Sequence, residues 1–163
     1  MPTGTVEGEL ICFNSRWNHL PTQNNPRIFL HAKVDNDLLA YWTLDDDVED
    51  YSSYNKDGTN YGGINNLSGY SAGAFDFDGD DYVDLPSDLG YTNQVSAFAW
   101  FKADGNPPGG YHIILGGQEL EISVPTTGEL RTGVETSSGR FVSNHGSGLN
   151  DGDWHFIGFT FNG

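Results

Sequence analysis

The feature that most constrains the fold is a repeated alternation of apolar and polar residues in short runs along the chain. Side chains alternate between the two faces of a strand, whereas a helix repeats every 3.6 residues, and a helical period is hard to find here. Turn-forming segments such as Lys56-Asp57-Gly58, Asp78-Gly79-Asp80 and Asn150-Asp151-Gly152 separate the runs. We therefore predict an all-β chain that forms a two-sheet antiparallel sandwich.

Each predicted strand combines apolar character with a flanking turn signal. The predicted strands are Gly8 to Phe13, Arg27 to Val34, Leu38 to Leu44, Gly73 to Phe77, Tyr82 to Leu85, Val95 to Lys102, Tyr111 to Leu115, Glu119 to Val124, Glu129 to Val134, Arg140 to Ser143 and Trp154 to Phe161. The run from Val95 to Lys102 has apolar groups on both alternating faces, which predicts a central strand covered on both sides. Trp42, Trp100 and Trp154 are predicted to be core or near-core side chains.

The net charge excludes several classes of partner. The chain has 23 Asp or Glu against 7 Lys or Arg, a formal charge of −16, so nucleic acid and anionic membrane surfaces would be repelled. Most of the imbalance lies between Leu38 and Asp88. Carboxylates that folding brings together raise one another's pKa unless water, backbone N–H groups or a cation intervenes. This segment therefore points either to a cation site or to plain solvation.

Length and cysteine content set further bounds. A chain of 163 residues suits one domain with a short extension, and we place an N-terminal arm or pairing strands in residues 1–37 and the sandwich in residues 38–163. Cys12 is the single cysteine, so no intrachain disulfide forms. No apolar run approaches the roughly 20 residues that span a bilayer, and the first residues have no visible export signal. We expect no membrane insertion.

Several blocks, in order, resemble the laminin-G-like branch of the concanavalin A-like lectin/glucanase superfamily. They are Leu38-Leu-Ala-Tyr-Trp-Thr-Leu44, Ala74-Phe-Asp-Phe-Asp-Gly-Asp-Asp-Tyr-Val-Asp-Leu-Pro86, Phe98-Ala-Trp-Phe-Lys102 and Asp153-Trp-His-Phe-Ile-Gly-Phe-Thr-Phe-Asn-Gly163. The resemblance implies a concanavalin A-like jelly-roll sandwich for residues 38–163. Family members continue past the last block into further strands, so the sandwich looks incomplete at its C-terminus. We expect a fragment, or completion by the arm in residues 1–37 or by another chain.

A calcium site is predicted in the acidic segment. Asp50, Asn55 and Asp57 in one loop, with Asp78 and Asp80 in the following hairpin, provide the hard oxygen ligands that Ca²⁺ prefers. The resemblance supports this prediction, because laminin-G-like domains often hold calcium in loops at the rim of the sandwich. The alternative is that Asp50 and Asp57 cap turns while the other side chains are solvated.

A catalytic interpretation fits the residues less well. Glu119 and Glu121 would share one face of a strand about 6 to 7 Å apart, a spacing compatible with glycoside hydrolysis. Glucanases of the superfamily resemble E-x-D-x-x-E, and this chain has Glu121 in place of the Asp and Val124 in place of the last Glu. We therefore expect no enzyme and no catalytic residues.

The function that this sequence favours is a non-enzymatic recognition or adhesion module for carbohydrate or protein, stabilised by calcium and acting outside the cell or on a virion surface. A structural component of an assembly, such as a phage virion fibre or decoration protein, is the alternative, with other chains completing the sandwich. A glycoside hydrolase of the glucanase branch is the second alternative. Tyrosines beside Gly- and Asn-rich loops are candidates for stacking on sugar rings, and the sequence leaves the choice among them open: Tyr51, Tyr54, Tyr61, Tyr70, Tyr91 and Tyr111.

Overall fold

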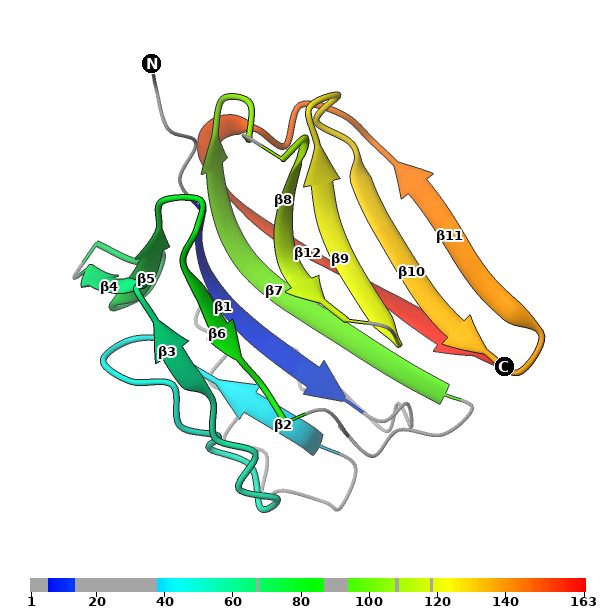
Figure 1. Ribbon diagram of the computed structural model, residues 1–163, viewed down its shortest axis with the longest axis horizontal. Coiled ribbons are helices and arrows are strands. Elements are labelled where there is room, and N and C mark those ends of the chain that lie inside the picture. Colours follow the sequence, from blue (N-terminus) through cyan, green and yellow to red (C-terminus); the bar gives the residue numbers. More distant parts are fainter. Residues whose placement is uncertain (1–5, 14–37, 67, 87–93, 108, 118) are drawn as a thin grey trace, which may run out of the picture.

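The computed structural model describes residues 6–13, 38–66, 68–86, 94–107, 109–117 and 119–163. Every regular element in this part of the chain is a β-strand, and every strand pairing is antiparallel (Figure 1). The predicted all-β fold is confirmed.

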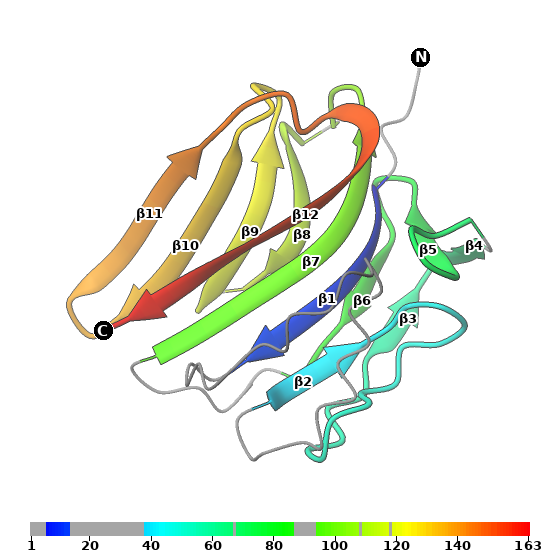
Figure 2. The ribbon, with the colours of Figure 1, turned by 180° about the vertical axis from the view of Figure 1, so that it is seen from behind.

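The first sheet has six strands. Its order is β12-β7-β1-β5-β4, and β2 pairs with one end of β1. The bounds are β1 Val6–Phe13, β2 Leu38–Trp42, β4 Ile64–Asn66, β5 Ala74–Phe77, β7 Gln94–Asp104 and β12 Asp151–Asn162. The long strands β7 and β12 run side by side, and Figure 2 shows this sheet from its outer side.

The second sheet has four strands in the order β11-β10-β9-β8. Its members are β8 Tyr111–Gly116, β9 Leu120–Pro125, β10 Leu130–Thr136 and β11 Gly139–His145. It lies over β7 and β12 of the first sheet (Figures 1 and 2). A separate short ladder pairs β3, Thr59–Tyr61, with β6, Tyr82–Asp84.

The core lies between the two sheets. Along β7 the alternate residues Val95, Ala97, Ala99, Phe101 and Ala103 are buried, as the pleat of a strand requires. They form one cluster with side chains that face them from β2, β8, β9, β10 and β12, which include Trp42, Leu115, Ile122, Val124, Val134 and Ile157. The buried side chains of the two sheets thus form one continuous core.

The first described strand, β1, lies inside the first sheet. The backbone of β1 pairs with β7 from Val6 opposite Ala103 to Phe13 opposite Ser96, and on its other side it pairs with β5 and β2. The predicted strand from Arg27 to Val34 lies outside the described residues. The domain boundary at residue 37 stays a prediction, and so does the incomplete C-terminus.

Two tryptophans differ from the prediction. Trp42 is buried in the core, whereas Trp100 and Trp154 lie half-buried on the side of β7 and β12 that faces away from the second sheet. The reason is the pleat, because Trp100 falls between the inward-facing Ala99 and Phe101. The outer side of β7 is therefore an aromatic surface that the described residues cover only in part.

Replacing a phenylalanine by alanine should lower the free energy of unfolding by different amounts on the two sides of this sheet. We expect Phe101→Ala to lower the free energy of unfolding by about 3 to 5 kcal/mol, because it empties a fully buried site. Phe156→Ala, in the neighbouring strand, should cost about 1 kcal/mol or less, since this side chain is 45% exposed. Urea unfolding of both variants checks the prediction. Equal costs would contradict the placement of these two rings on opposite sides of the sheet.

Candidate functional site

Asp50 anchors the loop that follows β2. Its Oδ1 accepts hydrogen bonds from the backbone N–H groups of Tyr41 and Ser52, each at 2.8 Å. Its Oδ2 accepts from the Ser52 hydroxyl at 2.7 Å and from the Lys56 N–H at 2.8 Å. The residue is only 6% exposed. Both carboxylate oxygens are thus already engaged by the protein's own donors.

These hydrogen bonds determine how Asp50 ionises. Burial alone would raise the pKa of Asp50, but the hydrogen bonds from Ser52, Lys56 and Tyr41 outweigh burial and hold that pKa below the ordinary value. The Asp50 N–H donates to Asp57 Oδ1 at 2.9 Å, and Asn55 adopts a left-handed backbone conformation with φ 49°. Asp57 and Asn55 are exposed, so they are the more open oxygen donors of this loop.

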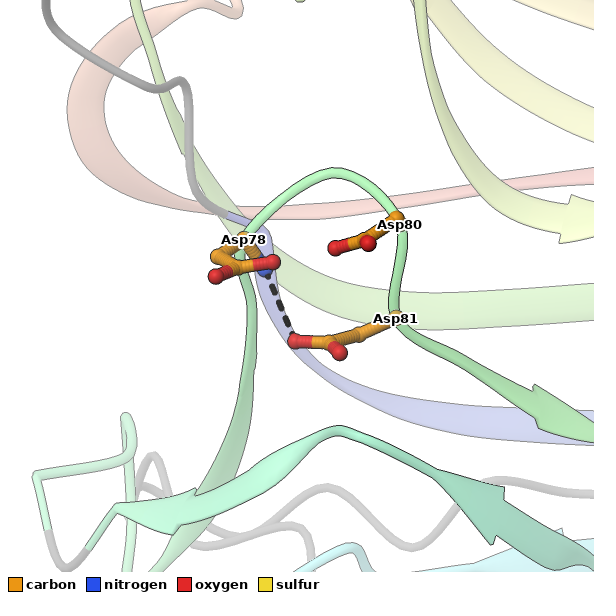
Figure 3. A group of neighbouring side chains, drawn as sticks. All are labelled: Asp78, Asp80 and Asp81. Atoms are coloured by element: carbon orange, nitrogen blue, oxygen red, sulfur yellow. Dashed lines mark hydrogen bonds between the residues drawn. The ribbon is translucent and has the colours of Figure 1, made fainter.

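A second acidic group lies in the turn between β5 and β6. One carboxylate oxygen from each of Asp78, Asp80 and Asp81 can be chosen so that all three lie within 4.8 Å of one another (Figure 3). The Asp78 N–H donates to Asp81 Oδ2 at 3.2 Å. The pKa of Asp78 is raised by the hydrogen bond it shares with the carboxyl of Asp80 and by the negative charge of Asp81. We call Asp78, Asp80 and Asp81 the acidic hairpin.

The sequence prediction of metal ligands omitted Asp81, whose place depends on a distant glycine. A Cβ atom on Gly62 would lie 1.8 Å from Asp81 Oδ1, and Gly62 has a positive φ of 92°. The next residues, Tyr61 and Tyr82, pair across the β3–β6 ladder with stacked rings 4.8 Å apart. The pairing of β3 with β6 brings Gly62 next to Asp81, and the sequence alone does not show this contact.

The predicted ligands fall into two groups. Thr59, just after the Asp50 loop, pairs with Asp84, whereas the acidic hairpin directly precedes Tyr82, which pairs with Tyr61. The two groups therefore lie at opposite ends of the β3–β6 ladder (Figure 1). At one end of this ladder the structure brings Asp78 and Asp80 together with Asp81. The other end of the ladder carries the loop that contains Asp50, Asn55 and Asp57.

The two glutamates considered for catalysis differ in their surroundings. Glu119 is exposed and precedes the first residue of β9, while Glu121 lies within that strand. Glu121 accepts hydrogen bonds from Arg140 at 2.6 Å, Arg131 at 2.9 Å and Ser123 at 2.8 Å. Burial opposes ionisation, but the bonds from Arg140, Ser123 and Arg131 prevail and lower the pKa of Glu121. This carboxylate is held ionised by its neighbours.

The outer side of the first sheet carries a continuous group of rings. We call Tyr70, Phe98, Trp100, Trp154 and Phe156 the outer aromatic face. The Tyr70 ring, from the loop before β5, stacks on Trp100 at 3.6 Å between centroids and meets the Trp154 ring edge-on at 6.4 Å. Phe156 lies 5.2 Å from Trp100 and 5.8 Å from Phe98. Sequence patterns had indicated Tyr70 only as one of several loop tyrosines.

A small pocket opens where the outer aromatic face meets the loop before β5. Its lining includes Asp45, Tyr70, Ser71, Trp100 and Trp154. Asp45 Oδ1 accepts a hydrogen bond from the Gly73 N–H at 3.0 Å. The pKa of Asp45 is raised, first by burial and then by the charges of two neighbouring aspartates, against the lowering effect of the Gly73 bond. Polar and aromatic groups thus meet at one place.

Comparison with known proteins identifies the family to which this chain belongs. The family described as the concanavalin A-like lectin/glucanases superfamily, in its laminin G form, matches residues 77–163, which is more than half of the chain. The chain belongs to this superfamily. The predicted resemblance and the predicted sandwich are confirmed. No curated protein and no solved structure gives a significant match.

Membership of the concanavalin A-like superfamily sets the range of functions. Its domains often bind carbohydrate or protein, laminin-G-like members often bind Ca²⁺ and are generally non-enzymatic, and the superfamily also includes glucanases. The matched residues begin at Phe77 and include the whole acidic hairpin, β7 and β12. Asp45, Asp50 and Tyr70 lie before the matched region. Among the described residues, no helix is long and apolar enough to cross a membrane.

The hydrogen bonds of Asp50 predict its effect on stability. We expect Asp50→Asn to lower the free energy of unfolding by about 2 to 3 kcal/mol near neutral pH, because an amide cannot accept all four bonds. The exposed Glu49→Gln, which removes the same charge next door, should change stability by less than about 0.5 kcal/mol.

The pH dependence of this effect has a definite sign. Since the folded-state pKa of Asp50 is lowered, its contribution is complete above the ordinary pKa of 3.8 and is lost as the pH falls through the folded value. The difference between the wild type and Asp50→Asn should therefore shrink on acidification in urea unfolding series. A difference that stays constant down to the lowest accessible pH would show that Asp50 is not the titrating anchor of this loop.

Proposed function

We propose that this protein is a non-enzymatic recognition or adhesion module that binds carbohydrate or protein outside the cell or on a virion surface. The observation that carries the proposal is the outer aromatic face, where rings that a core would normally bury meet solvent in part. Phe156 is 45% exposed and Tyr70 46% exposed, and both touch the rings of Trp100. A contiguous exposed apolar patch on a soluble domain marks an interaction surface.

The state of Glu121 supports binding rather than hydrolysis. A glycosidase needs one carboxylic acid with a raised pKa and a second carboxylate at a defined distance. The pKa of Glu121 is lowered through its pairs with Arg131 and Arg140, and Glu119 stands outside β9. Glu121 is thus held ionised and does not supply the protonated acid, which disfavours a role for this carboxylate in glycoside hydrolysis.

Calcium is proposed as a structural ion at the acidic hairpin. Asp78, Asp80 and Asp81 provide carboxylate oxygens close enough to share one ion, and Ca²⁺ completes its six to eight ligands with carbonyls and water. The pKa of Asp78 is raised by its hydrogen bond with Asp80 and then by the charge of Asp81, and a bound cation would favour the ionised form of all three carboxyls. The oxygens of Asp50 are already occupied by hydrogen bonds, which makes the hairpin the better candidate of the two predicted groups.

Calcium binding predicts a thermal shift. At 1 mM CaCl₂, a site with a Kd of about 10 μM would add about 2.7 kcal/mol, which raises the Tm of a chain of this size by roughly 5 to 10 °C. The double variant Asp78→Asn/Asp80→Asn should lose this shift, whereas Asp84→Asn, an exposed neighbour on β6 outside the cluster, should keep it. Differential scanning calorimetry with Ca²⁺, Mg²⁺ or EDTA provides the measurement. An equal shift in wild type and double variant would locate the ion elsewhere.

A role in an assembly is the second candidate, and strand β11 favours it. Within the described residues β11 pairs only with β10, and Arg140 to His145 are all exposed. Phe141 and Val142 add apolar surface to this open edge, 55% and 43% exposed respectively. An edge of this kind can accept a strand from another chain.

Binding arrays test the main proposal. We expect the protein to bind members of a glycan array or an array of extracellular proteins, and Phe156→Ala to weaken that binding at least about fivefold, because it removes an exposed ring from the centre of the face. Light scattering on the same sample should give a mass near 17.8 kDa. Blank arrays together with a mass several times larger would contradict recognition by this face and favour the assembly role.

A further inference from the structure

The ladder of β3 and β6 presents an exposed face that the recognition function proposed above does not use (Figure 1). Across this ladder Tyr61 pairs with Tyr82, and Thr59 pairs with Asp84. Leu85, just after β6, packs against the core, so the alternation of side chains along the strand turns Tyr82 and Asp84 to the solvent. We call Thr59, Tyr61, Tyr82 and Asp84 the ladder face.

The two tyrosine rings of the ladder face are stacked on each other and only half covered. Their centroids lie 4.8 Å apart with 16° between the ring planes, and Tyr61 is 48% and Tyr82 53% exposed. On the second sheet, the exposed ring of Tyr111 has the Arg131 guanidinium 5.9 Å from its centre. No cation among the described residues lies over Tyr61 or Tyr82. Because an aromatic ring attracts a cation, this stack keeps an unused binding capacity.

The surroundings of the tyrosine stack are negatively charged. Asp84 leaves β6 on the same side as Tyr82, about 6 to 7 Å further along the strand. Neither carboxylate oxygen of Asp84 has a hydrogen-bond partner in the part of the chain that the structure describes. The sequence from Leu38 to Pro86 contains a single base, Lys56. A cation placed on the stack is therefore attracted by the rings and by a neighbouring carboxylate at the same time.

The open edges of the ladder indicate that this cation belongs to an extended chain. Within the described residues β3 and β6 pair only with each other, so each strand keeps one edge whose backbone groups face no other strand. We propose that the ladder face binds an arginine-bearing extended segment of another protein. The backbone of this segment adds to one edge of the ladder, and its guanidinium stacks on the tyrosine pair beside Asp84. This site is separate from the outer aromatic face and does not depend on it.

The chemistry of the ladder face distinguishes arginine from other partners. A guanidinium is planar, stacks on aromatic rings and pairs with a carboxylate through two N–H groups, whereas a lysine ammonium is a compact and strongly hydrated charge. An anionic segment would be repelled by Asp84 and by the net charge of −16. A free small cation would gain nothing from the open strand edge. An extended segment with arginine uses the rings, the carboxylate and the edge together.

Titration of the full chain with synthetic peptides tests this proposal. The probes have about eight residues and alternate threonine, a good strand former, with arginine, with lysine or with glutamine. The buffer contains CaCl₂, so that an ion at the acidic hairpin stays in place. We expect the arginine peptide to bind at least about threefold more tightly than the lysine peptide and at least about tenfold more tightly than the glutamine peptide. Its affinity should fall as NaCl is raised, because exposed charges are screened.

Two substitutions separate the contribution of the ring from that of the charge. Tyr82→Thr removes one ring but keeps a strand-forming residue, and it should weaken binding of the arginine peptide about fivefold. Asp84→Asn removes the charge at nearly constant size and should weaken binding about threefold. The matched controls are Tyr111→Thr on the second sheet and Glu119→Gln, which removes an exposed carboxylate just before β9. Each control should change the affinity by less than about 1.5-fold.

Amide chemical shifts provide a second readout that stays valid if Tyr82→Thr loosens the ladder. Titration of the wild type with the arginine peptide should shift the amides of β3 and β6, and Phe156→Ala, on the outer aromatic face, should leave these shifts unchanged. Shifts confined to other strands would overturn the location.

The affinities decide the remaining points. Equal losses in Asp84→Asn and Glu119→Gln would show that binding follows the net charge and would overturn the site. Equal affinity for the arginine and lysine peptides would overturn stacking on the tyrosines. N-acetyl-arginine amide that binds as tightly as the peptide would overturn the extended segment, and no binding of the arginine peptide would overturn the whole proposal.

Discussion

The pleat of β7 is the constraint on which the rest of the structure depends. Along Gln94–Asp104 every second residue is buried, and Phe101 is the largest of these buried side chains. Because β7 pairs with both β1 and β12, its register also decides which residues of β12 face inward. Ile157 lies opposite Ala99 and enters the core, while Phe156 lies opposite Trp100 and faces outward. The aromatic surface is therefore a direct consequence of the packing of the core.

Most of the fold could be predicted from short apolar runs, and the errors have identifiable causes. All predicted strands within the described residues overlap observed strands, and no end differs by more than three residues. The strands Thr59–Tyr61 and Ile64–Asn66 were missed, because a run of three residues is too short to show a period. The outer side of β7 was expected to be covered. Apolar sequence indicates a tendency toward burial but does not show whether another element supplies the cover.

For the acidic residues, sequence patterns could not predict which carboxylates are buried and which face one another. Asp50 and Asp78 look equivalent in the sequence, each standing in a loop rich in Asp and Gly. In the structure Asp50 is surrounded by backbone donors, whereas Asp78 faces other carboxylates, and their pKa values move in opposite directions. The difference comes from contacts between separate segments, Tyr41 with Asp50 and Gly62 with Asp81, which no local pattern contains. Loop composition therefore predicted an acidic site without distinguishing its members.

The two sides of the sandwich also differ in how far their carboxylates are already hydrogen-bonded. On the second sheet Glu121 is neutralised by Arg131 and Arg140, so two of the chain's few cations are directed to an internal carboxylate rather than to a ligand. On the outer side of the first sheet Asp45 keeps one oxygen without a partner among the described residues, next to rings that are only partly covered. A surface whose polar groups are already paired gains little from a ligand, since each new bond replaces an existing one. The outer side of the first sheet therefore keeps a carboxylate oxygen open next to partly exposed rings, whereas the carboxylate of Glu121 on the second sheet is already paired.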